Sequence, residues 1–292
     1  MILSGKGGTG KTTLASAFIK LSDARAYADC DVDAPNLHLV MSGRFPEPNR
    51  TNYISMPKAR IDITKCIGCG KCVRNCRFNA IDLDPGHRVD IFACEGCGVC
   101  EVVCPVGAIS LSPAIGGELM LYANNCSVFS TAMLRMGSGT PGKLVSEVKK
   151  HMAAAVTEGL DLAIIDGSPG IGCPIIASLS GVDMVLIVTE PSVSGISDME
   201  RIIKTAEIFR TRICVCVNKY DINPNKTENI VTYCLMKGLP FVGMIPFDKE
   251  AVKVTNEGLS IVDSACTSGM AVRGVFDRTM ELLFEESSCA NG

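Results

Sequence analysis

A glycine-rich loop near the start of the chain lies between a short apolar stretch and a helical stretch. It matches the P-loop pattern G-x-x-x-x-G-K-[ST] as Gly5-Lys6-Gly7-Gly8-Thr9-Gly10-Lys11-Thr12. The pattern needs a strand before it and a helix after it, and we predict these at Ile2–Ser4 and Lys11–Leu21. Glycines let backbone N–H groups converge on phosphate oxygens at the start of a helix. A glycine-rich turn that binds nothing is the alternative, and the flanking elements argue against it.

The loop predicts a nucleotide site with a divalent cation. Lys11 would neutralise the β- and γ-phosphates, and the Thr12 hydroxyl would bind Mg²⁺. We therefore expect ATP or ADP and Mg²⁺ as ligands. The predicted contacts in the loop are Gly5, Gly7, Gly8, Thr9, Gly10, Lys11, Thr12 and Thr13.

Outside residues 57–113, short apolar runs alternate with amphipathic stretches. Apolar runs of this length are typical of parallel strands covered on both faces by helices. The alternation predicts an α/β fold with a doubly wound, mostly parallel sheet. The predicted strands are Arg25–Ala28, Leu162–Asp166, Met184–Thr189, Ile213–Asn218 and Phe241–Pro246, and the predicted helices lie near 143–158, 196–210, 227–238 and 269–286.

Residues 57–113 interrupt this alternation and contain eight regularly spaced cysteines in two similar halves. Each half has the spacing C-x₂-C-x₂-C-x₃-C, so the segment is an internal repeat of about 28 residues. Such a short unit buries little apolar surface, and metal clusters would supply the missing stability. We predict an inserted small α+β domain at 57–113 within an ATPase domain formed by 1–56 and 114–292.

The cysteine spacing resembles that of bacterial dicluster ferredoxins, in which the fourth cysteine of each run binds the other cluster. The resemblance implies two [4Fe–4S] clusters and a ferredoxin-type insertion. Zinc is the competing ligand, because C-x₂-C pairs also bind it, but zinc has no use for four cysteines at this repeated spacing. Arg77 stands where a second proline often follows the run. Cluster one would use Cys66, Cys69, Cys72 and Cys104, and cluster two Cys94, Cys97, Cys100 and Cys76.

A second lysine, Lys6, lies within the P-loop. The run K-G-G-T-G-K-T resembles the deviant Walker A loop of the MinD/ParA/Mrp superfamily, which includes the nitrogenase iron protein. The resemblance covers most of residues 1–56 and 114–286. It implies a P-loop ATPase in which Lys6 reaches phosphates held by the other subunit of a dimer. A cation supplied in this way would make hydrolysis depend on dimerisation.

The resemblance also assigns two switch regions. In Asp29-Cys30-Asp31-Val32-Asp33, Asp31 best matches the aspartate that orients the attacking water, whereas Asp29 and Asp33 fit a cap and a loop charge. Asp166 begins the second switch, which runs to Gly172, and would take the Walker B role toward Mg²⁺. The expected catalytic residues are Lys6, Lys11, Asp31 and Asp166.

The family holds the adenine ring near the ends of later strands. Asn218 is the best base contact in this chain. Pro246 and Phe247 would pack on the ring, although packing in the core explains these two equally well.

Charge and composition exclude some partners. The formal net charge of −3 offers no basic face to nucleic acid. The sequence has no apolar run near the 18 residues of a membrane span and no leader, which predicts a cytoplasmic protein. The tail Met280–Glu286 is acidic, unlike the basic amphipathic helix of membrane-bound MinD.

The other cysteines and the histidines have no metal-ligand spacing. We expect Cys214 and Cys216 to face one side of a buried strand as apolar groups. Cys173 directly follows the second switch, and we expect it to be packed, with a redox role as the alternative. The histidines, His38, His87 and His151, form no ligand set.

Together these features predict an ATP-binding and hydrolysing dimeric switch that couples its nucleotide state to electron transfer through two clusters. It would act as a homodimer, or as a heterodimer with a related subunit, on an unidentified redox or iron–sulfur protein. A carrier of the Mrp type is one alternative, but the stretch Tyr220–Asn225 lacks the C-x-x-C that such carriers place there. A spatial organiser of the MinD or ParA type is the other.

Overall fold

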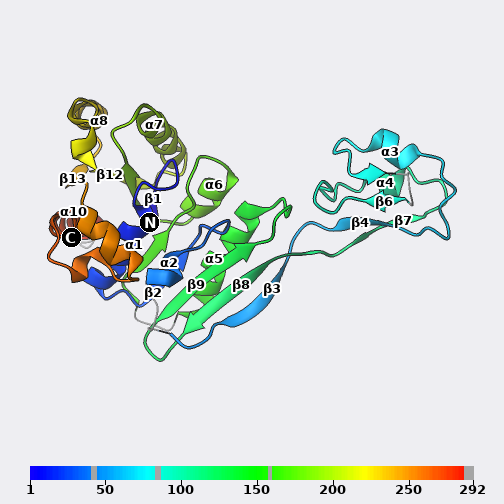
Figure 1. Ribbon diagram of the computed structural model, residues 1–292, viewed down its shortest axis with the longest axis horizontal. Coiled ribbons are helices and arrows are strands. Elements are labelled where there is room, and N and C mark those ends of the chain that lie inside the picture. Colours follow the sequence, from blue (N-terminus) through cyan, green and yellow to red (C-terminus); the bar gives the residue numbers. More distant parts are fainter. Residues whose placement is uncertain (41–44, 83–86, 157–159, 286–292) are drawn as a thin grey trace, which may run out of the picture.

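The structure is a computed structural model that describes residues 1–40, 45–82, 87–156 and 160–285 (Figure 1). Most of the chain forms a body around one large sheet. Its strands are β1 (Ile2–Leu3), β2 (Ala26–Asp29), β3 (Asn49–Ile54), β8 (Ile115–Ala123), β9 (Val128–Leu134), β10 (Ala163–Asp166), β11 (Met184–Thr189), β12 (Arg212–Asn218) and β13 (Phe241–Ile245).

Within the described residues this sheet has nine strands, in the order β13-β12-β11-β1-β10-β2-β9-β8-β3. The strands from β13 to β9 are parallel, whereas β8 and β3 continue the sheet in antiparallel pairing. The prediction of a mostly parallel α/β sheet is therefore confirmed. β1 lies between β11 and β10, where the strand order reverses, and ligands of such sheets bind beyond the carboxyl ends of the strands at that point.

Helices cover both faces of the sheet. On one face α1 and α10 pack through residues such as Phe18 and Val275, and on the other α5, α6, α7 and α8 contribute residues such as Val148, Ile202 and Ile230. The helices of the body are α1 (Lys11–Ser22), α2 (Leu37–Val40), α5 (Pro141–Ala155), α6 (Cys173–Leu179), α7 (Val193–Ile208), α8 (Pro224–Lys237), α9 (Lys249–Asn256) and α10 (Thr267–Phe284), with 3₁₀ turns η1 (Tyr220–Ile222) and η2 (Ile261–Asp263).

Local sequence signals explain several of these boundaries. β11 is apolar at almost every position and buried throughout, as expected for a strand covered on both faces. The Asn223 side chain accepts a hydrogen bond from Lys226 N at the start of α8, where Pro224 takes the first helical position. Gly238, with φ 64°, ends the same helix in the left-handed conformation.

The cysteine-rich segment extends away from the body on the continuation of β3 and β8 (Figure 1). The predicted limits at Pro57 and Pro113 fall in the short connections between β3 and β4 and between β7 and β8. We call residues 57–113 the insertion; its assignment as a separate domain stays a prediction. It contains β4 (Lys58–Ile61), α3 (Lys71–Asn75), β5 (Ile81–Asp82), β6 (Arg88–Val89), α4 (Val99–Val102) and β7 (Ile109–Ser112), with antiparallel pairs β4–β7 and β5–β6.

No helix in the described part of the chain is both long and apolar enough to cross a membrane.

Candidate nucleotide and cluster sites

The P-loop connects β1 to α1, as predicted. Two of its glycines have backbone conformations that disfavour other residues, since φ is 79° at Gly8 and 88° at Gly10. A Cβ atom at Gly10 would lie only 2.3 Å from Nδ2 of Asn218. The first backbone N–H groups of α1 have no intrahelical acceptor and face the loop that precedes them. This arrangement is suited to bind phosphate.

Lys11 and Thr12 meet the Walker B candidate at the end of β10. Lys11 Nζ lies 2.5 Å from Asp166 Oδ1, and the Thr12 hydroxyl donates to Asp166 Oδ2 at 2.7 Å. Asp166 is fully buried and Lys11 almost so. Burial opposes the charge of Lys11, but the Asp166 carboxylate outweighs it, with smaller contributions from Asp29 and Asp31, and the pKa of Lys11 is raised. The predicted phosphate lysine, the Mg²⁺ hydroxyl and the Walker B carboxylate thus form one cluster.

The two other carboxylates near Lys11 have different environments. Asp29 caps the turn before α2, because its side chain accepts from Asp31 N at 2.9 Å and from Asn36 N and Leu37 N at 3.0 Å. Burial, followed by the charge of Asp166, raises the pKa of Asp29 to about 7. Asp29 therefore has the capping role that we considered for it.

Asp31 is half-buried and carries no such set of backbone donors. Burial raises its pKa, against the opposing charge of Lys11. Asp33 is exposed, as expected for a loop charge. The geometry leaves Asp31 as the candidate of the three to contact a water or Mg²⁺, and its catalytic role stays a prediction.

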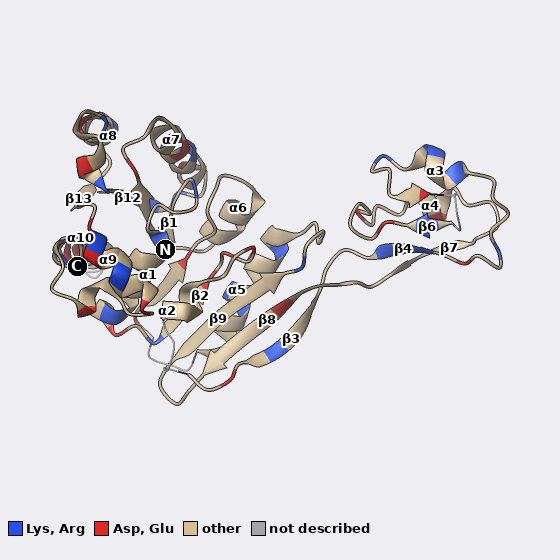
Figure 2. Cartoon of the chain, in the orientation of Figure 1, with Lys and Arg blue, Asp and Glu red and all other residues tan. Residues whose placement is uncertain are grey.

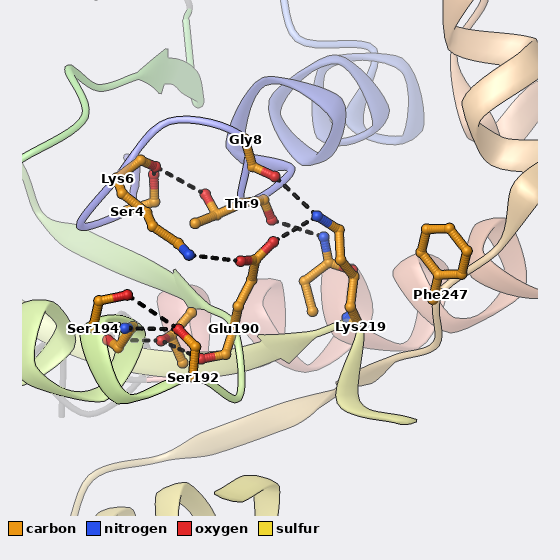
Figure 3. A network of polar contacts seen from close by, with 12 residues as sticks. Ser4, Lys6, Gly8, Thr9, Glu190, Ser192, Ser194, Lys219 and Phe247 are labelled. Carbon is orange, nitrogen blue, oxygen red and sulfur yellow. Dashed lines mark hydrogen bonds and ion pairs between the residues drawn. The ribbon is translucent and has the colours of Figure 1, made fainter. Parts of the chain in front are cut away.

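Glu190 is a residue that the sequence analysis missed. It follows β11, and its carboxylate pairs with Lys6 Nζ at 3.1 Å and with Lys219 Nζ at 2.5 Å (Figure 3). Lys219 also donates to the carbonyl oxygen of Gly8 at 3.0 Å. Burial alone would raise the pKa of Glu190, but its bonds to Lys219 and Lys6 lower it. A polar residue directly after a buried strand of a parallel sheet was the signal that could have found it.

These contacts hold Lys6 against its own chain. Its side chain is 38% exposed, so the ammonium group is accessible while it is paired. The predicted reach of Lys6 to a partner's phosphates would require it to leave Glu190.

A pocket of about 230 Å³ lies beside the P-loop, and the three predicted base contacts line it. Asn218, Pro246 and Phe247 line it together with Gly8 and Thr13. Much of the Asn218 amide is already used, because Nδ2 donates to Thr9 O at 2.7 Å and Oδ1 accepts from Lys219 N at 2.9 Å. Asn218 therefore braces the P-loop as well as facing the pocket.

Phe247 is 44% exposed, so it is not a core residue. Its backbone N–H donates to Asp221 Oδ1 at 2.7 Å, which fixes the chain at the rim of the pocket. These positions favour a base-packing role for Phe247 over the core-packing alternative.

The second switch region is tied to the strand that carries the P-loop. Gly167 N donates to Ile2 O at 2.9 Å, and Gly170 N donates to Ser4 O at 3.2 Å. The Ser168 hydroxyl donates to the carbonyl oxygen of Cys30, in the first switch. The P-loop and both switch regions therefore share hydrogen bonds.

In the insertion, the two halves of the repeat have matching backbone conformations. α3 and α4 each begin after a left-handed glycine, Gly70 with φ 68° and Gly98 with φ 79°. Asn79 and Gly107 occupy the same repeat position and both have positive φ, at 50° and 60°. Ala80 N donates to Cys76 Sγ at 3.4 Å, and Ala108 N donates to Cys104 Sγ at 3.2 Å.

Four of the eight thiols of the repeat lie around one small pocket. Cys76, from the first half, lines a small pocket with Cys94, Cys97 and Cys100 from the second half. This is the crossed set expected for cluster two. In the other set, burial raises the pKa of Cys72, with smaller contributions from Cys66 and Cys69.

The described part of the chain contains no group of three or more histidine, cysteine, aspartate or glutamate side chains that could hold a single metal ion. The two clusters therefore stay a prediction.

The thiols outside the repeat differ in exposure. Cys214 and Cys216 are completely buried in the core on the same face of the sheet, as predicted. Cys173 is exposed at the start of α6, so the expectation that it is packed was wrong. The reason is that α6 begins there, and its buried residues, such as Ile175 and Leu179, lie further along the helix. Cys289 lies outside the described residues.

A mostly parallel α/β sheet with a P-loop after β1 defines a P-loop nucleotide-binding protein. Comparisons with known proteins place it more closely. A family model for the CobQ/CobB/MinD/ParA nucleotide binding domain matches residues 1–261. Uncharacterized protein MJ0578 of Methanocaldococcus jannaschii is 31% identical over 97% of this chain and 96% of its own length. The chain therefore belongs to the CobQ/CobB/MinD/ParA nucleotide-binding family.

Relatives with a named role are more distant. The chloroplastic MinD homolog of Arabidopsis thaliana, a septum site-determining protein, is 25% identical over 90% of this chain and 68% of its own length. The septum site-determining protein MinD of Pyrococcus horikoshii, solved in complex with Mg-ADP, aligns with a TM-score of 0.57 and 16% identity. That alignment covers 96% of this chain and 95% of the other, and at this identity it shows the shared fold.

Proposed function

We propose that this protein is an ATP-driven switch that binds Mg²⁺ and ATP at the P-loop and hydrolyses ATP as a dimer. Lys11 would hold the phosphates, Thr12 and Asp166 would hold Mg²⁺, and Asp31 would orient the attacking water. The observation that supports this assignment is the convergence of Lys11, Thr12 and Asp166 within 2.7 Å contacts at the carboxyl end of the sheet. Asn218 and Phe247 would flank the base.

Lys6 would act in the partner's site. In the single chain Glu190 holds it at 3.1 Å, and a phosphate placed by a second subunit would compete for the same ammonium group. Hydrolysis should therefore rise with protein concentration as dimers form. Replacing Lys6 with alanine should slow hydrolysis and leave ATP binding in place, whereas an unchanged rate would mean that the lysine reaches no phosphate.

We further propose that the insertion holds two [4Fe–4S] clusters, which when bound supply one-electron transfer. The crossed pocket of Cys76 with Cys94, Cys97 and Cys100 is the observation that carries this proposal. A tetrahedral zinc ion would need its four ligand atoms in a single shell. The repeated C-x₂-C-x₂-C-x₃-C pattern, with Cys76 in the pocket of the second half, supports cubanes instead.

The two sites are connected through the loop after β9. Val32, in the first switch, accepts from Leu134 N at 2.8 Å at the end of that strand. Just beyond it, Gly137 packs against Phe92, since a Cβ there would lie 2.8 Å from its ring. Lys58 donates to Gly137 O at 3.2 Å and to the carbonyl oxygen of Cys94. A movement of the first switch would therefore shift the chain beside Cys94, a predicted cluster ligand.

The experiment that tests the coupling measures ATP hydrolysis by anaerobic protein with its clusters oxidised and then reduced. We expect different rates in the two states, and a Lys58→Ala variant should reduce that difference while retaining its iron. Lys65→Ala is the matched control, because Lys65 lies in the insertion but pairs locally with Asp62 at 3.4 Å. Equal rates in the oxidised and reduced protein would refute the coupling and leave both sites intact.

A spatial organiser of the MinD or ParA type is the second candidate, and the comparisons favour it more directly than electron transfer. The named relatives are septum site-determining proteins, and a MinC:MinD complex from Aquifex aeolicus is among the solved structures with the same fold. Such a protein would assemble on a surface or a partner only when ATP is bound. ATP-dependent sedimentation with a partner, at a hydrolysis rate indifferent to the clusters, would favour this candidate.

A further inference from the structure

The two halves of the insertion have similar backbone conformations but carry different side chains at matching positions. α3 begins at the fifth position after the first cysteine of its run, and α4 begins at the same position in the second run. The first half has cations where the second has apolar residues or proline, and apolar residues where the second has acids. The matched pairs are Lys65 with Ala93, Lys71 with Val99, Arg74 with Val102, Arg77 with Pro105, Ile67 with Glu95, and Val73 with Glu101.

The four cations of the first half form what we call the basic face: Lys65, Lys71, Arg74 and Arg77. All four are exposed, and Figure 2 shows blue segments on and beside α3. Lys65 pairs with Asp62. Among the described residues Lys71 and Arg77 have no carboxylate partner, and Arg74 donates to the carbonyl oxygen of Cys69 at 2.9 Å. The face therefore carries uncompensated positive charge on a chain whose net charge is −3, and the expectation of no basic face, drawn from that net charge, does not hold for the insertion.

One edge of the second half touches the loop after β9, whereas its helix α4 is exposed, with Val102 85% exposed. A Cβ at Gly139 would lie 2.5 Å from the Glu95 carboxylate, and Phe92 packs on Gly137. On the basic face Ile67 is 65% exposed, and the Cys69 thiol beside it is exposed too. A predicted ligand of cluster one thus lies at the surface, on the same half of the insertion as the four cations.

We propose that the basic face is the docking surface for an acidic one-electron carrier protein of the iron–sulfur or flavin class. One electron would pass from the reduced carrier to cluster one, so that the carrier is oxidised and the cluster reduced by one electron. The inference rests on the proposed cluster binding. Opposite charges steer such encounters and raise their rate, and the exposed Ile67 would supply an apolar contact.

The test compares two double variants that change the net charge by the same amount. Lys71→Gln with Arg74→Gln removes two cations from the basic face, and Val99→Glu with Val102→Glu adds two acids at the matching positions of the second half. Calorimetry measures the affinity of each protein for an acidic plant-type [2Fe–2S] ferredoxin at low and at physiological salt. We expect the first variant to bind about three- to tenfold more weakly at low salt, and the second to bind as the unmodified chain does.

A kinetic arm uses small oxidants on the dithionite-reduced protein. Ferricyanide, an anion, should oxidise the Lys71→Gln, Arg74→Gln variant more slowly than the unmodified chain, and hexaamminecobalt(III), a cation, should not. In both reactions the cluster loses one electron and the oxidant gains it. Equal effects of the two double variants, or no ferredoxin binding by the unmodified chain, would overturn the docking proposal.

Iron and sulfide are measured in every sample. Protein without iron would refute the proposed clusters. Protein with its full iron content, whose affinity for the ferredoxin does not depend on the charge of the basic face, would refute only the docking surface. A single-stranded DNA oligonucleotide and vesicles of anionic lipid serve as competing polyanions. If either binds the basic face and the ferredoxin does not, the face recognises a polyanion and the proposal is wrong.

Discussion

The body and the insertion of this protein are held together by different means. The body buries large apolar side chains on both faces of its sheet, among them Phe18, Tyr27 and Phe129. The core of the insertion within the described residues consists of seven buried side chains, and three of them are Cys72, Cys94 and Cys100. A segment with so little apolar burial depends on what its thiols bind. The body should therefore fold from its apolar strands alone, and the insertion should need its clusters.

The largest effect is expected from a change that disables the body and spares the insertion. Lys11→Ala removes the cation that meets Asp166 at 2.5 Å. Since this ammonium group would stabilise charge that develops on the phosphates, ATP hydrolysis should fall about a hundredfold or more. Iron content should not change.

The control for this prediction is Lys20→Ala, on the same helix. Lys20 pairs with Asp263 at the surface and should leave hydrolysis unchanged. Loss of iron in the Lys11→Ala protein would contradict the separation of the two regions.

A second prediction concerns pH and the carboxylates of the body. Asp29 has a pKa of about 7, raised by burial and then by Asp166, so it loses its proton between pH 6 and 8. Its negative charge favours a bound cation, and the affinity for Mg-ADP should rise about tenfold over this range and then level off. Calorimetry at several pH values measures this, with Asp29→Asn as the reference whose profile is flatter. An identical profile in both proteins would assign the dependence to the nucleotide alone.

The raised pKa of Asp29 has the opposite effect on the stability of the ligand-free protein. A raised pKa stabilises the folded state below the unfolded value of 3.8, and this contribution is lost as pH rises toward 7. The ligand-free protein should therefore lose part of its stability between these values.

A third prediction tests the contacts that hold Lys6. Glu190→Gln removes the charge that pairs with Lys6 and Lys219, and the free energy of unfolding should fall by about 1 kcal/mol. Because the pKa of Glu190 is lowered from 4.5, the difference should be present above that pH and shrink below it. Urea unfolding measures both. Glu147→Gln is the control: Glu147 pairs with Lys150 on an exposed helix face and should change stability little.

The smallest effect is expected from removing a single thiol of the insertion. Cys100→Ala should lower the iron content by about half, because it removes one ligand of one cluster. Cys216→Ala, a change of the same type in the core of the body, should leave the iron unchanged. Metal analysis of both proteins distinguishes the two outcomes. Equal iron in both would mean that Cys100 holds no cluster.

Much of the body could be predicted because its strands are short apolar runs with polar ends. β11 was predicted to the residue, and β10, β12 and β13 to within one residue at either end. β3, β8 and β9 were not predicted, because they form the antiparallel edge, where long mixed strands such as Ile115–Ala123 carry no clear turn or apolar signal.

The residues of the candidate sites likewise divide into those that could be predicted from the sequence and those that could not. Residues with a local motif, such as Lys11, Thr12 and the eight cysteines, could be found from spacing alone. Glu190 could not, since its partners Lys6 and Lys219 lie far from it in the sequence and only the strand order joins them. The exposure of Cys173 likewise depends on where α6 begins.

Metal and sulfide analysis of anaerobically purified protein tests the central claim most directly. Two [4Fe–4S] clusters predict about eight iron and eight acid-labile sulfide atoms per chain, and no stoichiometric zinc. Zinc at the thiols, or a chain with neither metal nor sulfide whose insertion is still folded, would contradict the account.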